Sequence, residues 1–345
     1  MNAILDEAYE RLHRTGPEWG GNLSNHGPMA AEVLVRRGRA EEVPSWLDAY
    51  IDRLDELPAP AEPVTDANWR EALSDFGRIG DWVLYFGHLV RERPWQEVLV
   101  TWWPRLLPGI VAAATHGVIR VSHAVRTLRS GDESPQAVAE LAHGLAWWAA
   151  RSRAVPGFTE LSGSLDSAAA FDAVPRIARQ DGLLADRFGR LGELASFPAS
   201  LAALRPATDP DDVRDRLAGL VAAATRKYLT HGHASPVLLV HTATAPNAVL
   251  NTLPALPRDL WAPSLSAVWA ASAAIISTYA PVPGAPRETL PEPPDADDPV
   301  SEVLDRAAAN GDEHVIKFTD TAVEAYARTP DPDLLAAAVR VGQLL

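Results

Sequence analysis

The strongest constraint on the fold is a helix-start signal that recurs along the chain and is followed by apolar residues at helical spacing. In the clearest case, Asp209-Pro210-Asp211-Asp212 places an N-cap residue before a proline and two acidic residues in the first turn. The residues that follow at the spacing of one buried helix face are Val213, Leu217, Leu220, Val221 and Ala224. Ser134-Pro135 and Ser235-Pro236 begin two further predicted helices in the same way.

Helical patterns cover most of the remaining chain, whereas the alternation typical of strands is nearly absent. The sequence therefore predicts an all-α fold, which we expect to form a single domain over residues 1–345. Further helices are predicted over residues 28–37, 44–57, 77–92, 95–113, 116–129, 258–279, 312–328 and 331–344. The proline- and acid-rich stretch 281–299 is predicted to be a surface linker that returns a final helical pair, and 153–170 resembles a second loop or lid.

The composition excludes several kinds of site. The chain has 345 residues, no cysteine and a formal net charge of −14. Without cysteine it forms no disulfide, zinc–thiolate or iron–sulfur site, so a metal would be held by histidine, carboxylate or a rarer ligand. The basic residues are scattered and do not form the stripe that phosphate binding needs, so we expect no nucleic-acid partner.

Two absences bear on location. The chain has no uninterrupted run of about 18 apolar residues, and its N-terminal segment lacks the basic start and apolar run of a signal peptide. We therefore expect a cytoplasmic protein with no membrane span. The sequence leaves the oligomeric state open, and a homodimer is compatible with it.

The most informative predicted helix covers residues 116–128. At 3.6 residues per turn, one of its faces carries His116, Arg120, His123 and Thr127. Because most other positions are apolar, we expect the helix to be buried and the polar stripe to line an internal, histidine-lined chamber; a solvated face is the alternative. His116 and His123 lie about 10 Å apart along the axis and cannot ligate one ion, so one would bind metal while the other contacts substrate or moves protons.

Lysine is rare in this arginine-rich chain, and only Lys227 and Lys317 are present. A lysine can be neutralised by burial, whereas an arginine keeps its proton, so a retained lysine is a hint of lysine-specific chemistry. His314 and Lys317 are neighbours on the surface of one predicted helix. Lys317 becomes a metal ligand only if it is neutral or is converted by carbon dioxide to a carbamate. The alternative is a solvated lysine at the margin of the apolar face.

Two further histidines stand at helix ends or kinks. His26 lies in Ser24-Asn25-His26-Gly27-Pro28-Met29, a loop that leads into a helix beginning at Pro28. His241 precedes Pro246, which must end or kink its helix and free a carbonyl near Thr242. Both histidines are candidate ligands, and a hydrogen-bonded structural role is the alternative for each.

The aromatic content is also informative. The chain has 11 tryptophans, including the pairs Trp102-Trp103 and Trp147-Trp148. Most should belong to the core, and the surplus suits a pocket for a flat aromatic ligand. No dinucleotide fingerprint, phosphate-binding loop or nucleophile elbow is present.

Four segments resemble the questin oxidase-like family, and they follow the family order along the chain. They are Ser24–Met29, Gly109–Ala124, His241–Pro246 and His314–Phe318. Fungal members of this family oxidise or open anthraquinone-type rings in aromatic polyketide pathways. The present chain is shorter than the fungal members, and Arg120 stands where their pattern has a second histidine.

The resemblance implies an oxygen-dependent enzyme with a mononuclear non-haem iron. Carried across residue by residue, the implied ligands are His26, His116, His241, His314 and Lys317, the last as its carbamate. The implied cofactors are Fe(II) and O₂, with NADPH as an external reductant. Imidazole suits iron, and a carbamate supplies a hard anionic oxygen.

We therefore expect an iron-dependent oxygenase that hydroxylates, cleaves or inserts oxygen into a polycyclic aromatic or quinone metabolite. In this prediction His123 moves a proton to or from a phenol, and Arg120 stabilises an oxyanion. Two alternatives remain open. A metal-dependent hydrolase or lyase would use the same ligands with a metal-bound hydroxide as nucleophile. A non-catalytic carrier would use its histidines only to hydrogen-bond an aromatic metabolite.

Overall fold

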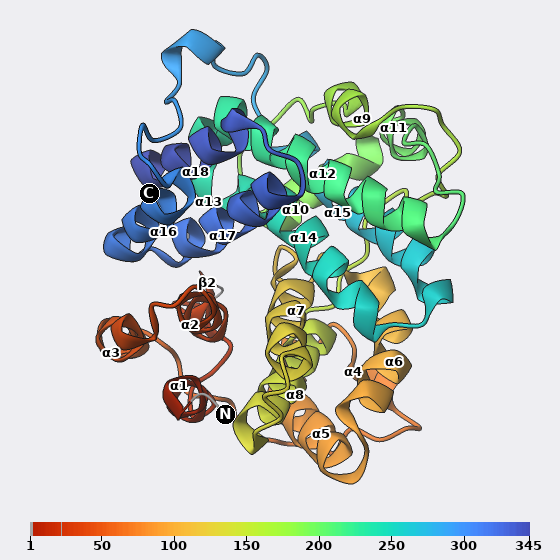
Figure 1. The fold of residues 1–345 in the computed structure, drawn as a ribbon. Coiled ribbons are helices and arrows are strands. Elements are labelled where there is room, and N and C mark those ends of the chain that lie inside the picture. Colours follow the sequence, from red (N-terminus) through yellow and green to blue (C-terminus); the bar gives the residue numbers. More distant parts are fainter. Residues whose placement is uncertain (1–2, 22) are drawn as a thin grey trace. The chain divides into compact units, whose positions relative to one another are not determined.

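The computed structural model describes residues 3–21 and 23–345, and its regular secondary structure is almost entirely helical (Figure 1). Within this described part, the only sheet is an antiparallel hairpin of β1 (Glu18–Trp19) and β2 (Leu23–Ser24). The all-α prediction is confirmed. Residues 1, 2 and 22 of the predicted domain 1–345 lie outside the described residues.

The chain folds into two compact units. The first unit contains Met1–Ala154 and Asn251–Pro257, and the second contains Val155–Leu250 and Arg258–Leu345. The prediction of a single domain over 1–345 stays a prediction.

In the first unit, α8 is the central helix and packs against α1, α5, α6 and α7, while α2 packs against α1, α3 and α7. Close approach of α7 and α8 depends on small residues: a Cβ at Gly117 would lie 2.7 Å from Cβ of Trp148. The helices of this unit are α1 (Ala3–Leu12), α2 (Gly27–Arg36), η1 (Ala40–Glu42), α3 (Val43–Ile51), α4 (Trp69–Ala72), η2 (Phe76–Arg78), α5 (Ile79–Glu92), α6 (Trp95–Leu106), η3 (Leu107–Gly109), α7 (His116–Arg129), α8 (Pro135–Ala150) and η6 (Leu253–Ala255).

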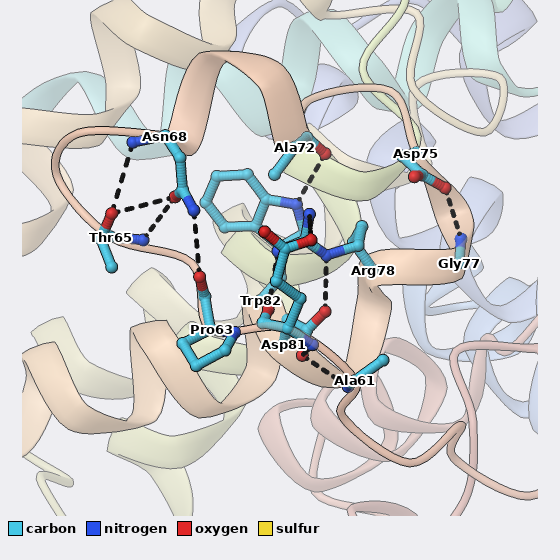
Figure 2. A network of polar contacts seen from close by, with 11 residues as sticks. Ala61, Pro63, Thr65, Asn68, Ala72, Asp75, Gly77, Arg78, Asp81 and Trp82 are labelled. Carbon is cyan, nitrogen blue, oxygen red and sulfur yellow. Dashed lines mark hydrogen bonds and ion pairs between the residues drawn. The ribbon is translucent and has the colours of Figure 1, made fainter.

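A polar network ties the irregular segment before α5 to that helix (Figure 2). The carboxylate of Asp81 accepts hydrogen bonds from the backbone N–H groups of Ala61 and Glu62, at 2.8 and 2.9 Å. Its second oxygen accepts from Nε of Arg78 at 2.6 Å. Nearby, the indole N–H of Trp82 donates to the carbonyl of Ala72 at 3.1 Å. The backbone groups of a segment without regular structure are thus satisfied by side chains of its neighbours.

In the second unit, α15 is the apolar central helix, and α10, α11, α12 and α13 pack against it; α12 also packs against α9, α17 and α18. The helices of this unit are α9 (Ser167–Ala173), α10 (Leu184–Gly189), η4 (Arg190–Glu193), α11 (Phe197–Ala202), α12 (Pro210–His231), η5 (Gly232–Ala234), α13 (Pro236–Leu239), α14 (His241–Thr252, whose end lies in the first unit), η7 (Arg258–Leu260), α15 (Trp261–Tyr279), η8 (Arg287–Thr289), α16 (Pro299–Asn310), α17 (Glu313–Arg328) and α18 (Pro332–Leu344).

One stretch, Arg258–Tyr279, is long and apolar enough to cross a membrane by length and composition. However, 78% of its apolar window is buried inside the protein, as in the core helix of a soluble protein. The cytoplasmic location stays a prediction.

The helix-start signals are largely confirmed. The Asp209 side chain accepts from the N–H groups of Asp211 and Asp212, and Ser134 accepts from Ala137. Ser235 makes no such side-chain bond, and the helix after it, α13, has only four residues.

Two predicted helices are too long. The helix expected over 44–57 ends at Ile51, because the backbone of Asp55 pairs instead with Gly16 and Glu18. The helix expected over 95–113 ends at Leu106, after which the chain forms the short η3 turn.

The stretch 281–299 is mostly at the surface, as predicted, but it is anchored to the unit. Leu290 is buried, and Arg287 pairs with Asp333 at 2.9 Å. Three helices follow it rather than the predicted pair, because α16 begins inside the predicted linker, where Asp298 caps a helix that starts with Pro299.

Helix α7 has no solvated face, so that alternative is wrong. All residues from His116 to Leu128 are buried except Arg126, which is partly buried. The Arg120 guanidinium donates to both carboxylate oxygens of Glu140 on α8, at 2.6 and 2.8 Å, and His13 lies 2.8 Å from the same carboxylate. Burial opposes ionisation of Glu140, but Arg120 and His13 outweigh it and lower the pKa of this carboxyl to about 2.

We expect Glu140→Gln to lower the free energy of unfolding by about 3–5 kcal/mol, because it leaves the buried charge of Arg120 uncompensated. Urea unfolding measures the change. The matched control is Glu10→Gln on α1, which breaks the exposed Arg14–Glu10 ion pair and should cost less than about 1 kcal/mol. Equal losses in the two variants would contradict this account.

Candidate functional site

Four histidines stand at the first positions of helices. His26 is the N-cap residue of α2, His116 and His241 are the first residues of α7 and α14, and His314 is the second residue of α17. The N-terminus of a helix carries partial positive charge, which disfavours protonation of a nearby imidazole. Neutral imidazole is the form that binds metal. The four histidines thus share a position at the start of a helix.

In the first unit, His26 and His116 face each other. Their Nε2 atoms lie 2.7 Å apart, and both side chains are buried. The ring of His116 also lies 5.7 Å from the ring of Trp147 on α8, centroid to centroid. The structure thus brings together two of the residues that the sequence singled out, although 90 positions separate them.

The Ser24–Met29 motif is explained by the way it holds His26. The backbone N–H of His26 donates to the Tyr50 hydroxyl at 2.5 Å. The Asn25 side chain accepts from the N–H of Gly27 at 2.9 Å and donates to the carbonyl of Gly16 at 3.0 Å. A Cβ at Gly27 would lie 2.5 Å from a methyl group of Leu12, so a larger residue there would force the Leu12 side chain to move.

In the second unit, His241, His314 and Lys317 are all buried. The two imidazole rings are 6.3 Å apart, centroid to centroid, and nearly perpendicular. Burial lowers the pKa of Lys317 to about 7, although Glu313 and Asp312 oppose the shift. Burial, followed by the charges of Lys317 and His314, holds the pKa of His241 well below its ordinary value. Lys317 is therefore not a solvated lysine, and a substantial neutral fraction exists near neutral pH.

Three of the histidines share one hydrogen-bond pattern. Nδ1 of His116 contacts the carbonyl of Ala113, and Nδ1 of His241 lies 3.2 Å from the carbonyl of Leu238. Nδ1 of His314 lies 3.2 Å from a carboxylate oxygen of Asp312. A carbonyl or carboxylate only accepts hydrogen bonds, so each Nδ1 is the donor and carries the proton. Each Nε2 is consequently the atom with a lone pair for a metal.

Pro246 lies inside α14, which continues past it to Thr252. Because proline has no backbone N–H, Pro246 cannot donate to the carbonyl of Thr242 as a helical residue would. This carbonyl instead accepts a hydrogen bond from the Ser272 hydroxyl at 3.3 Å. The predicted free carbonyl is thus real, and a side chain of α15 satisfies it.

Arg120 and His123, the predicted catalytic residues, both make buried ion pairs within the first unit. Arg120 is bound to Glu140 as described above, and Nδ1 of His123 lies 2.7 Å from a carboxylate oxygen of Glu32 on α2. Glu32 also pairs with Arg126. Burial raises the pKa of Glu32, but Arg126 and His123 outweigh it and lower this pKa to about 2. The catalytic roles of Arg120 and His123 stay predictions.

Sequence reasoning missed the partners of the α7 stripe, Glu32 and Glu140. A signal for them was present, because each is a single acidic residue in an otherwise apolar stretch, MAAEVLV and VAELA. A buried carboxylate in such a helix requires a positive or hydrogen-bonding partner. The arginine and histidine of the α7 stripe are residues of the required kind.

We expect stability in acid to depend on Glu32. Its pKa in the folded protein is about 2, below the ordinary 4.5, so the ionised carboxylate stabilises the fold above pH 4.5. This contribution, about 3 kcal/mol, is lost as the pH falls from 4.5 to 2. Urea unfolding across this range should show a shallower pH dependence for Glu32→Gln, whereas the exposed control Glu10→Gln should keep the wild-type slope. An unchanged slope in Glu32→Gln would refute the assignment.

Neither a protein-family model nor a curated protein matches the sequence. The resemblance to the questin oxidase-like family therefore rests on the four segments Ser24–Met29, Gly109–Ala124, His241–Pro246 and His314–Phe318.

Proposed function

We propose that this protein is a non-haem iron oxygenase that acts on a polycyclic aromatic or quinone metabolite. The observation that carries the proposal is the hydrogen-bond pattern shared by His116, His241 and His314. Metal-ligating histidines almost always donate their other ring N–H to a backbone carbonyl or a carboxylate, which fixes the tautomer and the ring orientation. All three residues do so from buried positions at the start of a helix.

The proposed ligands are the five that the family resemblance implies: His26 and His116 from the first unit, and His241, His314 and Lys317 from the second. The chemistry of each group suits this role. Imidazole is a good ligand for iron, and Lys317 as a carbamate would contribute a hard anionic oxygen. Only a neutral amine reacts with carbon dioxide, and burial of Lys317 supplies that form.

Iron, when bound, would supply the activation of O₂. The residues of the chain supply orientation and exclusion of water. Ala113, Leu238 and Asp312 hold Nδ1 of the three histidines, and burial keeps bulk water from their Nε2 atoms. Arg120 would stabilise an oxyanion only by leaving Glu140, whereas His123 would exchange a proton through Nε2 while its Nδ1 stays on Glu32. We therefore propose that their first role is to hold α2 and α8 around His26 and His116.

The electron balance separates two versions of the reaction. A monooxygenase transfers one atom of O₂ to the ring and reduces the other to water with two electrons from an external reductant, for which we propose NADPH. A dioxygenase places both atoms in the product and needs no reductant. The absence of a dinucleotide fingerprint fits a reductant that binds only transiently.

We expect about one iron per chain in protein purified without a histidine tag, measured by plasma mass spectrometry. Lys317→Ala and Lys317→Arg should lose the metal, since neither side chain forms a carbamate. The matched control is Lys227→Ala: Lys227 is the other lysine of the chain and pairs with Asp172. No metal in any sample, even after anaerobic loading with Fe(II), would refute the metalloenzyme and favour the carrier. If the Lys317→Arg protein keeps its iron, a carbamate on Lys317 is excluded as a metal ligand.

Oxygen consumption distinguishes the oxygenase from a hydrolase or lyase that uses the same ligands. With Fe(II)-loaded protein, NADPH and a panel of hydroxylated anthraquinones, we expect consumption of O₂ that depends on the quinone and stops in Lys317→Ala. Turnover of a quinone under strict anaerobiosis would contradict the oxygenase and favour metal-assisted hydrolysis.

A further inference from the structure

The turn that leads into α7 has an uncommon backbone. Three consecutive residues, Ala113, Ala114 and Thr115, have φ values of 45°, 55° and 74°. This is the left-handed region, which residues with a Cβ adopt at an energetic cost and which glycine adopts readily. Strained backbone of this kind persists only where its surroundings hold it, and it clusters at functional sites.

Glycine is used on both sides of this turn, but for close packing. A Cβ at Gly109 would collide with the side chain of Ser152, and one at Gly117 would collide with Trp148. Between these two glycines the chain has alanine and threonine at the three positions where glycine would relieve the backbone. The residues of the turn therefore do not favour its conformation, and the surrounding structure must hold it.

The turn aims one carbonyl group at His116. The carbonyl of Ala113 accepts the backbone N–H of His116 at 3.2 Å and is also the partner of its ring Nδ1. The Ser24 hydroxyl lies 3.1 Å from the same Nδ1. Two oxygens from different segments thus bracket one ring nitrogen, and the opposite nitrogen, Nε2, faces Nε2 of His26 at 2.7 Å.

The surroundings hold the turn from both ends. The backbone N–H of Val111 donates to the carbonyl of Arg153 at 3.2 Å, and the Trp148 indole donates to the carbonyl of Gly109 at 3.2 Å. Thr115 is fully buried, and its carbonyl accepts the backbone N–H of Ile119 in α7 at 3.2 Å. The turn cannot relax without disturbing its packing against α8 and the start of α7.

We propose that Ala113, Ala114, Thr115 and Ser24 are positioning residues, which hold His116 in one tautomer and one ring orientation so that its Nε2 is presented to the metal. The inference rests on the proposed function, because the metal is what gives Nε2 its role. Glycine in the turn would let the Ala113 carbonyl move, and the imidazole would then sample both tautomers and several orientations.

The test compares Ala113→Gly and Ala114→Gly with Ser74→Gly. Ser74 is a matched control, because it also has a positive φ, 66°, in the same unit and makes none of the contacts of His116. Nitrogen-15 spectra of the imidazoles read the tautomer in protein without metal, competition with a chelator measures Fe(II) affinity, and urea unfolding measures stability.

We expect the two turn variants to keep wild-type stability, to show mixed tautomers for His116 and to bind Fe(II) at least about 10-fold more weakly. Ser74→Gly should match wild type in tautomer and affinity. A single Nδ1–H tautomer and unchanged affinity in both turn variants would overturn the proposal. If the wild-type protein binds no metal but the two turn variants still show mixed tautomers for His116, the positioning role of the turn is supported and the proposed iron oxygenase is refuted.

A second pair of variants tests the Ser24 hydroxyl. Ser24→Ala should broaden the tautomer distribution of His116 and weaken Fe(II) binding, and Ser24→Thr, which keeps a hydroxyl, should restore both. Equal behaviour of the two variants and wild type would show that the carbonyl of Ala113 suffices and would remove Ser24 from the proposal.

Discussion

Helix α7 is buried from His116 to Leu128 apart from the partly buried Arg126, and among its buried residues are one arginine and two histidines. The packing of the first unit depends on how these groups are satisfied. A charge without a partner in the protein interior costs several kcal/mol. Arg120 therefore pairs with Glu140 of α8, and His123 with Glu32 of α2. These two carboxylates determine which helices surround α7. The same packing places His26, at the start of α2, against His116, at the start of α7.

The candidate ligands follow from a second, local constraint. A histidine at the start of a helix stays neutral more readily, and a nearby oxygen that only accepts hydrogen bonds then decides which ring nitrogen keeps the proton. In both units the proton is held at Nδ1, by Ala113, Leu238 and Asp312. Units that differ in their helices thus present the same atom, Nε2, from buried positions. A hydrogen bond from the other ring nitrogen to an oxygen is what metal-ligating histidines have, and this shared pattern is the observation behind the proposed site.

Local signals predicted much of this structure. The caps at Ser134 and Asp209, the burial of α7 and the carbonyl freed by Pro246 all depend on residues close in sequence, and all are found. The start of α16 was missed because Asp298-Pro299 lies in a stretch whose composition suggested a linker.

Contacts that depend on tertiary packing could not be predicted in this way. The pairing of Arg120 with Glu140, and of His26 with His116, requires knowing which helices are neighbours. The left-handed turn at Ala113–Thr115 contradicts local preference, since alanine and threonine favour other conformations. The sequence could not predict whether Lys317 is buried, because helical spacing places it at the margin of the apolar face. At such a margin, tertiary packing determines whether a side chain is buried or exposed.

The most direct test of the account is an anomalous difference map, measured at the iron absorption edge, from crystals of protein loaded anaerobically with Fe(II). The account predicts one strong peak within coordination distance of Nε2 of His116, His241 and His314, with Nδ1 of each still bonded to its oxygen. A peak elsewhere, or coordination through Nδ1, would contradict it.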